Sequence, residues 1–285
     1  MSNDVCSILL SGYFDETSPL QSSVTRYKVN ELLVCEKTDY CAATIVNSPD
    51  YGRMLFLDGE LQSSSYDEAI YHETLVHPIM NAYADLKDKH VLVIGGAEGA
   101  TVREVLKWSD VKMLEWVDID GRLIELCKQH MRFCDVALYD APNLYLFVED
   151  IMMHLGRLTA PTYDIIIIDL PDPDPAMDGP LYGAEFWSLV HRVLKPGGGI
   201  VTHCGPVDPG IGKQEGLKIV QDGAGSTGFP YHTFIPSFQG HWGFWMNRAP
   251  APAAAAATAP LPKDCKIMNP DYQRTIFHWD AHWFS

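Results

Sequence analysis

The chain has 285 residues, 47% of them hydrophobic and 20% charged, which is ordinary for a globular protein. Its 37 acidic residues outnumber its 21 lysines and arginines, and the formal net charge of -16 repels nucleic acid and anionic membranes while attracting cations. We therefore expect neither nucleic acid nor membrane as a partner. A cationic small molecule fits the charge, although a general need for solubility also explains it.

The seven cysteines include no C-x-x-C pair, and the N-terminal stretch "MSNDVCSILLSGYF" lacks a basic region followed by a long apolar one. These features predict a reduced, cytoplasmic protein without a disulfide framework. No apolar run reaches the roughly 18 residues that a membrane-spanning helix needs.

A metal site is not expected from the histidine spacing. The stretch "HETLVH" places His72 and His77 five residues apart, whereas a zinc-binding helix has its two histidines four apart. A spacing of five puts the two side chains on different faces of a helix.

The first part of the chain reads as short strands. Between residues 25 and 62, "LLVCEK", "CAATIV" and "RMLFLDGELQ" are rich in β-branched and apolar residues and are separated by turn sequences. We predict a small antiparallel β domain over residues 1–65. The following stretch, 67–83, has apolar residues at helical spacing and should lead into the main domain, residues 66–285.

From about residue 88, strands and helices are expected to alternate. Continuous apolar runs indicate strands buried on both faces, and alternation with helices makes such strands parallel. The predicted strands are 90–96, 113–120, 144–150 and 163–170, with helices at 101–108 and 121–131. The prediction is a doubly wound α/β fold, which binds ligands beyond the carboxyl ends of its strands.

The last part of the main domain adds a helix and a strand within 181–205 and a closing hairpin from 231–238 and 242–248. The stretch 249–263, mostly alanine and proline, has low complexity and is expected to be a flexible surface insertion without chemistry.

Acidic residues follow the predicted strands. One acid lies in the glycine-rich turn, and the others stand at or after strand ends, where helix caps and turns also favour aspartate. These residues are Glu98, Asp118, Asp120, Asp150, Asp169 and Asp172. Because the carboxyl ends of parallel strands share one edge of the sheet, we expect them to line one rim.

The turn after the first buried strand indicates a nucleoside. Asp118 follows Gly95 by 23 residues, close to the spacing at which Rossmann-like domains hold a ribose. A nicotinamide enzyme is one candidate. However, alanines at 97 and 100 occupy two of the three glycine positions of the dinucleotide motif, so pyrophosphate binding is not expected.

Glu98 lies inside this turn, where its carboxylate would repel a phosphate or a carboxylate. Decarboxylated S-adenosylmethionine has a ribose, an adenine and an amine but no carboxylate. We therefore expect Glu98 to pair with its ammonium group in a charge-assisted hydrogen bond. A solvated turn residue is the alternative.

The loop "IIIIDLPDPDPAMDGPLY" after the last buried strand contains four aspartates among prolines. Proline restricts the backbone, so the carboxylates are held in place with little further entropy loss on binding. The spacing does not match a calcium loop, which is the rival interpretation. A diamine or polyamine fits better.

In combination, these stretches resemble the polyamine aminopropyltransferases, the spermidine, spermine and thermospermine synthases. "LDGELQSSSYDEAIYHE" is similar to the family's substrate-gate segment, "VLVIGGAEGATVREVLKW" to its glycine loop, "EWVDID" to its ribose-binding strand end and "IIIIDLPDP" to its catalytic loop. The resemblance covers about two thirds of the chain. "YHETLVHP", "HCGP" and "IPSFQGHWGFWM" look most like the thermospermine synthase branch.

The resemblance implies a Rossmann-like fold of the class I methyltransferase kind, a homodimer, no permanently bound cofactor, and decarboxylated S-adenosylmethionine as co-substrate. It also implies a role for each matching residue. Gln62, Gly95, Gly96, Glu98, Asp118 and Asp150 would bind the donor, His72 and Phe238 would border the polyamine, and Asp169, Asp172 and Tyr71 would be catalytic, with Asp172 also holding the polyamine's far end.

Three departures accompany the resemblance. Ala97 replaces a glycine, Asp118 stands where glutamate is commoner, and Pro171 together with the extra "DPAMD" lengthens the catalytic loop. The last bears on the acceptor. Spermidine as acceptor, giving thermospermine or spermine, is the expectation, and putrescine is the alternative. A small-amine methyltransferase and a non-catalytic binder on the same fold are the other two function classes.

Overall fold

The computed structural model describes residues 8, 11–17, 24–133, 135–174, 180–208, 214–225, 227–248 and 261–279. Most of the insertion expected at 249–263 therefore lies outside the described residues. Within the described part of the chain, no helix is long and apolar enough to cross a membrane.

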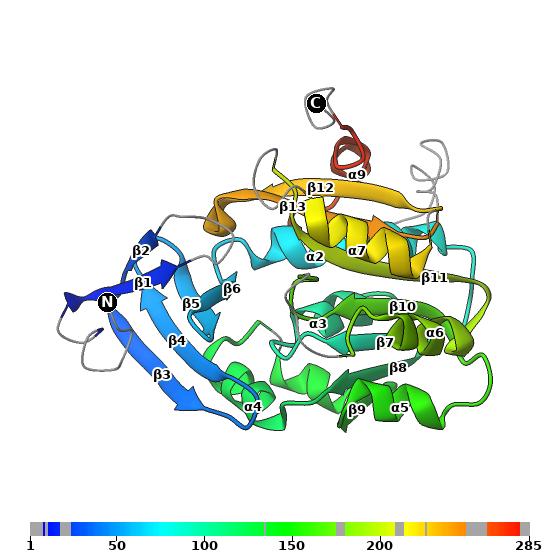
Figure 1. Cartoon of the computed structure of the whole chain (residues 1–285), viewed down its shortest axis with the longest axis horizontal. Helices are drawn as coiled ribbons and strands as arrows, with labels where there is room; N and C mark the ends of the chain where they lie inside the picture. Colours follow the sequence, from blue (N-terminus) through cyan, green and yellow to red (C-terminus); the bar gives the residue numbers. More distant parts are fainter. Residues whose placement is uncertain are drawn as a thin grey trace.

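Two small antiparallel sheets form the N-terminal part, at one end of the molecule (Figure 1). Strands β1 (Tyr13–Thr17) and β2 (Val24–Lys28) make a pair, and the second sheet has the order β3-β4-β5-β6. Its strands are β3 (Glu31–Lys37), β4 (Ala42–Ser48), β5 (Gly52–Leu57) and β6 (Glu60–Ser64). The predicted antiparallel strands are confirmed.

The main sheet has seven strands in the order β12-β13-β11-β10-β7-β8-β9. They are β7 (Lys89–Gly95), β8 (Val111–Asp118), β9 (Leu144–Val148), β10 (Tyr163–Asp169), β11 (Leu194–Pro206), β12 (Phe229–Ile235) and β13 (Gly240–Met246). Strands β7 to β11 pair in parallel, and the hairpin β12–β13 closes the sheet antiparallel. The doubly wound fold is confirmed, and its strand order reverses between β7 and β10.

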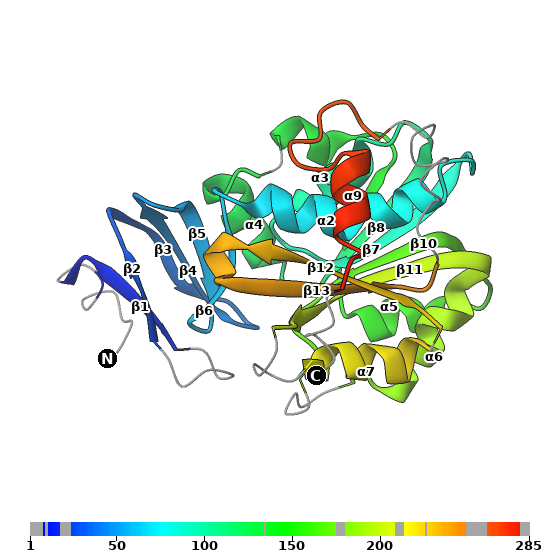
Figure 2. The same ribbon diagram turned by 90° about the horizontal axis from the view of Figure 1, so that it is seen from above.

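Helices cover both faces of this sheet (Figure 2). One apolar cluster joins the sheet to α2 (Glu68–Ala82), α3 (Ala100–Leu106) and α4 (Gly121–His130). The other joins it to α5 (Ile151–Arg157), α6 (Ala184–Val193) and α7 (Glu215–Ala224). The remaining helical turns are η1 (Val136–Asp140), η3 (Pro236–Phe238) and α9 (Pro270–Thr275). The resulting core holds the strand ends in place.

One strand differs from expectation. The apolar run of β9 predicts burial on both faces, but Tyr145, Leu146 and Val148 are 50%, 41% and 55% exposed. The reason is topological, because β9 is the last strand of the sheet and pairs only with β8. An apolar run cannot by itself distinguish a central strand from an edge strand.

A buried carboxylate on α2 fixes the C-terminal segment. Glu73 is fully buried, and its two oxygens accept backbone N–H groups of Lys266, Ile267 and Met268 at 2.6, 2.9 and 2.6 Å. Segment 261–279 is thereby attached to the helix that also presents Tyr71 and His72.

We expect Glu73→Ala to lower the free energy of unfolding by on the order of 3 kcal/mol, because it leaves three backbone N–H groups without their acceptor. Chemical denaturation followed by circular dichroism measures this. Glu125→Ala, at an exposed position on α4, is the control. Equal effects of the two substitutions would contradict the anchoring role.

Candidate functional site

The glycine turn and the end of β10 meet where the strand order reverses. The backbone N–H of Gly96 donates to the carbonyl of Asp169 at 2.9 Å. Both Gly95 and Gly96 have positive φ angles, 80° and 71°. A Cβ at Gly95 would lie 2.2 Å from the Asp169 carbonyl oxygen, and one at Gly96 would lie 2.8 Å from its Oδ2. Only glycine permits this approach.

Two hydroxyl groups orient the carboxylate of Asp169. Tyr71 on α2 donates to Oδ1 at 2.8 Å, and Thr101 on α3 donates to Oδ2 at 2.6 Å. Burial, together with the charge of Asp169, raises the pKa of Tyr71 well above its ordinary value, so Tyr71 stays a donor. The expected catalytic residues Tyr71 and Asp169 are therefore in direct contact.

Two further acids lie close enough to Asp169 for its negative charge to change their pKa values. Burial raises the pKa of Glu98, and the negative charge of Asp169 raises it further, while His72 lowers it. Burial raises the pKa of Asp118 to about 7, with Asp120, Glu98 and Asp169 adding to the effect. Four acids of the rim expected from the sequence therefore repel one another, and a bound cation would stabilise them: Glu98, Asp118, Asp120 and Asp169.

Two acids of the rim cap helices. Asp120 accepts from the backbone N–H of Leu123 at 2.9 Å and from the hydroxyl of Thr38 at 2.5 Å. Asp150 accepts from the backbone N–H of Met152 at 2.6 Å, at the start of α5. For Asp120 this is a structural role. Asp150 is half-buried, and no described residue donates a hydrogen bond to its other oxygen.

Asp172 lies three residues beyond Asp169 and 38% of its side chain is exposed. Its Oδ1 is 3.3 Å from Nδ1 of His203 on β11, and its Oδ2 faces Gly205, where a Cβ would lie at 3.3 Å. Partial burial raises the pKa of Asp172, His203 lowers it, and Asp174 raises it.

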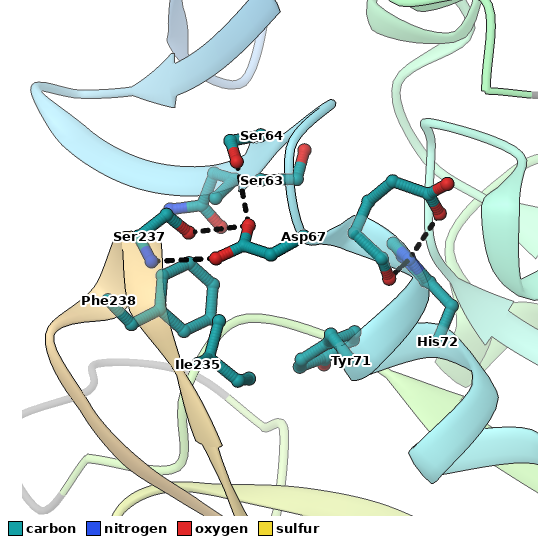
Figure 3. A pocket seen from close by; sticks show the side chains of 10 residues that line it. Ser63, Ser64, Asp67, Tyr71, His72, Ile235, Ser237 and Phe238 are labelled. Carbon is teal, nitrogen blue, oxygen red and sulfur yellow. Dashed lines mark hydrogen bonds and ion pairs between the residues drawn. The ribbon is translucent and has the colours of Figure 1, made fainter. Parts of the chain in front are cut away.

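A small pocket lies between β6, α2 and η3 (Figure 3). It is lined by Gln62, Ser63, Ser64, Asp67, Glu68, Tyr71, His72, Ile235, Ser237 and Phe238. The sequence therefore predicted four of its lining residues, and Tyr71 connects the pocket with Asp169. The other candidate donor-binding residues lie outside this pocket, at or just after the ends of β7, β8 and β9: Gly95, Gly96, Glu98, Asp118 and Asp150.

One buried carboxylate joins two walls of this pocket, as Figure 3 shows. Asp67, just before α2, accepts from the Ser64 hydroxyl at 2.6 Å, from the Ser237 backbone N–H at 2.7 Å and from the Ser237 hydroxyl at 2.9 Å. Asp67 and Ser237 are 3% and 1% exposed. The segment before α2 and the turn that carries Phe238 are thus held together.

The His72 ring contacts Glu68, which lies one helical turn earlier on α2. Its Nδ1 lies 2.7 Å from the Glu68 carbonyl and 3.3 Å from the Glu68 carboxylate. Burial alone would lower the pKa of His72, but Glu68 raises it above its ordinary value. Glu68 in turn binds Arg103 at 2.6 Å.

His77 faces elsewhere, as its spacing from His72 predicts. Its Nδ1 accepts from the Trp108 indole at 3.1 Å, and its Nε2 lies 3.0 Å from Glu104 and 3.2 Å from the sulfur of Cys265. Glu73, His77 and Cys265 are the one group among the described residues with metal-ligand geometry. Protein partners of Glu73 and His77 already explain the arrangement.

Sequence reasoning missed Thr101, His203 and Asp67 as site residues. Thr101 reads as an ordinary helix residue, and His203 lies in an apolar strand. Asp67 reads as a helix-start acid. Their partners, Asp169, Asp172 and Ser237, are between 31 and 170 positions away, so no local pattern signals the contacts.

Two family models match the chain. Residues 68–254 match the spermine/spermidine synthase domain, and residues 12–65 match the spermidine synthase tetramerisation domain. A polyamine aminopropyltransferase of Prochlorococcus marinus (strain MIT 9313) is 32% identical over 285 residues, covering 96% of each chain. One of Pyrobaculum neutrophilum is 35% identical, covering 76% of this chain and 75% of that protein.

Solved structures agree on the fold. A spermidine synthase in complex with the transition-state analogue AdoDATO has a TM-score of 0.82 at 23% identity, covering 94% of this chain and 92% of that one. Spermidine synthase from Thermotoga maritima has a TM-score of 0.80 at 22% identity, covering 94% and 91%. The chain therefore belongs to the spermine/spermidine synthase family and is a polyamine aminopropyltransferase.

Proposed function

We propose that the protein transfers the aminopropyl group of decarboxylated S-adenosylmethionine to spermidine, giving thermospermine or spermine and methylthioadenosine. The observation that carries this proposal is the carboxylate of Asp169, oriented by Tyr71 and Thr101 and close to the half-buried carboxylate of Glu98. A site with this charge favours two ammonium groups, one on the donor and one on the acceptor.

In this reaction a neutral amine attacks the carbon next to the donor's sulfonium. The new carbon–nitrogen bond forms as the carbon–sulfur bond breaks, and its electron pair leaves with sulfur as a neutral thioether. Positive charge moves from sulfur to nitrogen, so a carboxylate near the nitrogen stabilises the transition state and can take the proton. We assign this role to Asp169, with Tyr71 as the hydroxyl that orients it.

For the donor, we propose that Gly95 and Gly96 let its nucleoside approach the backbone, and that Asp118 accepts the ribose hydroxyls. Asp150, through its second oxygen, would accept from the adenine amino group, and Glu98 would pair with the aminopropyl ammonium. Gln62 would contact the nucleoside from β6. These roles place the donor along the carboxyl ends of β7, β8 and β9, which is where doubly wound folds bind ligands.

For the acceptor, we propose the space between Tyr71, His72, Phe238 and Asp172. The aromatic rings of Tyr71 and Phe238 are 6.3 Å apart and can contact methylene groups, while Asp172 can hold the far ammonium. The resemblance of "YHETLVHP" and "IPSFQGHWGFWM" to the thermospermine branch favours spermidine. Putrescine, giving spermidine, is the alternative.

We further propose a division into residues 1–65 and 66–285 and self-association through the N-terminal strands. A homodimer is the expectation from the sequence, whereas the matched model for 12–65 is named a tetramerisation domain and favours four copies. We propose a cytoplasmic location from the cysteine pattern of the sequence, which includes no C-x-x-C pair.

Product analysis tests the function. The purified protein, given decarboxylated S-adenosylmethionine and spermidine, should form a tetraamine whose chromatographic retention identifies it as thermospermine or spermine. Putrescine and S-adenosylmethionine serve as the alternative acceptor and donor. Spermidine formed from putrescine alone would overturn the proposed acceptor, and product from S-adenosylmethionine alone would indicate a methyltransferase.

We expect Asp169→Asn to lower kcat by about two to four orders of magnitude, because the amide keeps the shape but can neither take the proton nor stabilise the new positive charge. Steady-state kinetics measures this. Asp140→Asn, at an exposed position in η1, should retain normal kcat. An unchanged kcat in Asp169→Asn would exclude the assigned role.

We expect Glu98→Gln to weaken binding of decarboxylated S-adenosylmethionine by about 10- to 100-fold, the size of a charge-assisted hydrogen bond, while methylthioadenosine binds normally. Isothermal titration calorimetry with both ligands measures this. Asp118→Asn is the matched control and should weaken both ligands, since both contain the ribose. Equal loss of both ligands in Glu98→Gln would refute the ammonium pairing.

A further inference from the structure

The environment of His203 determines where its protons can lie. The imidazole is nearly completely buried, at 3% exposure, and its Nε2 contacts the carbonyl oxygen of Leu170. A carbonyl only accepts hydrogen bonds, so Nε2 must carry the hydrogen. The neutral ring therefore presents the lone pair of Nδ1 on its other side.

The carboxylate of Asp172 is in contact with this nitrogen. Nδ1 is 3.3 Å from Oδ1, and within the described part of the chain Nδ1 has no hydrogen-bond partner. An ionised carboxylate is also only an acceptor, so two acceptor atoms stand next to each other, one on a buried ring and one on a side chain that is 38% exposed. A single proton, on either atom, would give this contact the donor that it lacks.

We propose that His203 and Asp172 share one proton while the acceptor site is empty, and that binding of the acceptor's ammonium group releases this proton. The proposal rests on the proposed function and adds His203 to it as a residue that binds the acceptor. The ammonium replaces the proton between the two side chains, donating to the carboxylate and to Nδ1. Charge balances, because one bound proton leaves to solvent as one cationic group enters.

The surroundings favour such a shared proton. Among the residues that the structure describes, the titratable groups that face the pair are acids: Glu60 on β6, Tyr71 on α2, Asp169 at the end of β10, Asp174 in the following loop, Tyr182 before α6 and Cys204 on β11. Burial raises the pKa values of Tyr71, Tyr182 and Cys204 well above their ordinary range, so these three stay neutral. The carboxylates add negative charge, which favours a proton on Asp172.

The first test is the pH dependence of KM for the acceptor, with decarboxylated S-adenosylmethionine at saturation and spermidine or putrescine as the amine. In the wild type, KM should rise by up to about tenfold per pH unit over the acidic range in which the pair holds its proton. In His203→Asn the slope should flatten, because an amide cannot take up the proton and its N–H can donate to Asp172. His191→Asn, at an exposed position on α6, should keep the wild-type slope.

The second test needs no variant. Calorimetric titration with spermidine and with putrescine in the presence of methylthioadenosine, in buffers of different ionisation enthalpy between pH 6 and 8, counts the protons released. In this range primary amines stay protonated in solution. If the number of protons released on amine binding falls from about one to none as pH rises, the result supports a proton shared by His203 and Asp172. If product forms but release is absent, or His203→Asn keeps the wild-type slope, the shared proton is wrong. If neither amine binds, the proposed function fails with it.

Discussion

The close approach of two strand ends controls the geometry of this site. Gly95 and Gly96 bring the end of β7 against the end of β10, so that the backbone of one hydrogen-bonds to the backbone of the other. A side chain at either glycine would push Asp169 away. Tyr71 and Thr101 lie on two different helices. Both can reach the Asp169 carboxylate because the end of β10 holds it within hydrogen-bond distance of each. The orientation of the Asp169 carboxylate therefore depends first on the backbone.

The same approach concentrates negative charge in a partly dehydrated volume. Glu98 and Asp118 both have raised pKa values because burial and their acidic neighbours disfavour the ionised forms. Such a site is costly to maintain empty, and ligands with ammonium groups relieve the repulsion. Nucleotide phosphates would increase it. Selection for cations over anions thus follows from the spacing of the strand ends, without a dedicated contact for each candidate ligand.

Much of this arrangement could be predicted from the sequence, because apolar runs, their alternation with helical stretches and the acids at strand ends are local signals. The parallel sheet and the N-terminal strands follow from such signals. The exposure of β9 could not be predicted, since it depends on the strand's position at the sheet edge. Nor could the capping role of Asp120 be separated from a ligand role, because helix starts and binding sites favour the same residue type. Thr101 and His203 contact Asp169 and Asp172, which are distant from them in the sequence, so no local sequence pattern predicts these contacts.

Asp67 joins the segment before α2 to the turn that carries Phe238, and both segments line the pocket that we propose for the acceptor. A change in the length or angle of one wall therefore shifts the other through a shared carboxylate. In the divergence of this family, substitutions that adapt the pocket to a longer or shorter amine should then arise in pairs, one on each side of Asp67. The preference for one acceptor would then depend jointly on two segments that lie about 170 positions apart in the chain.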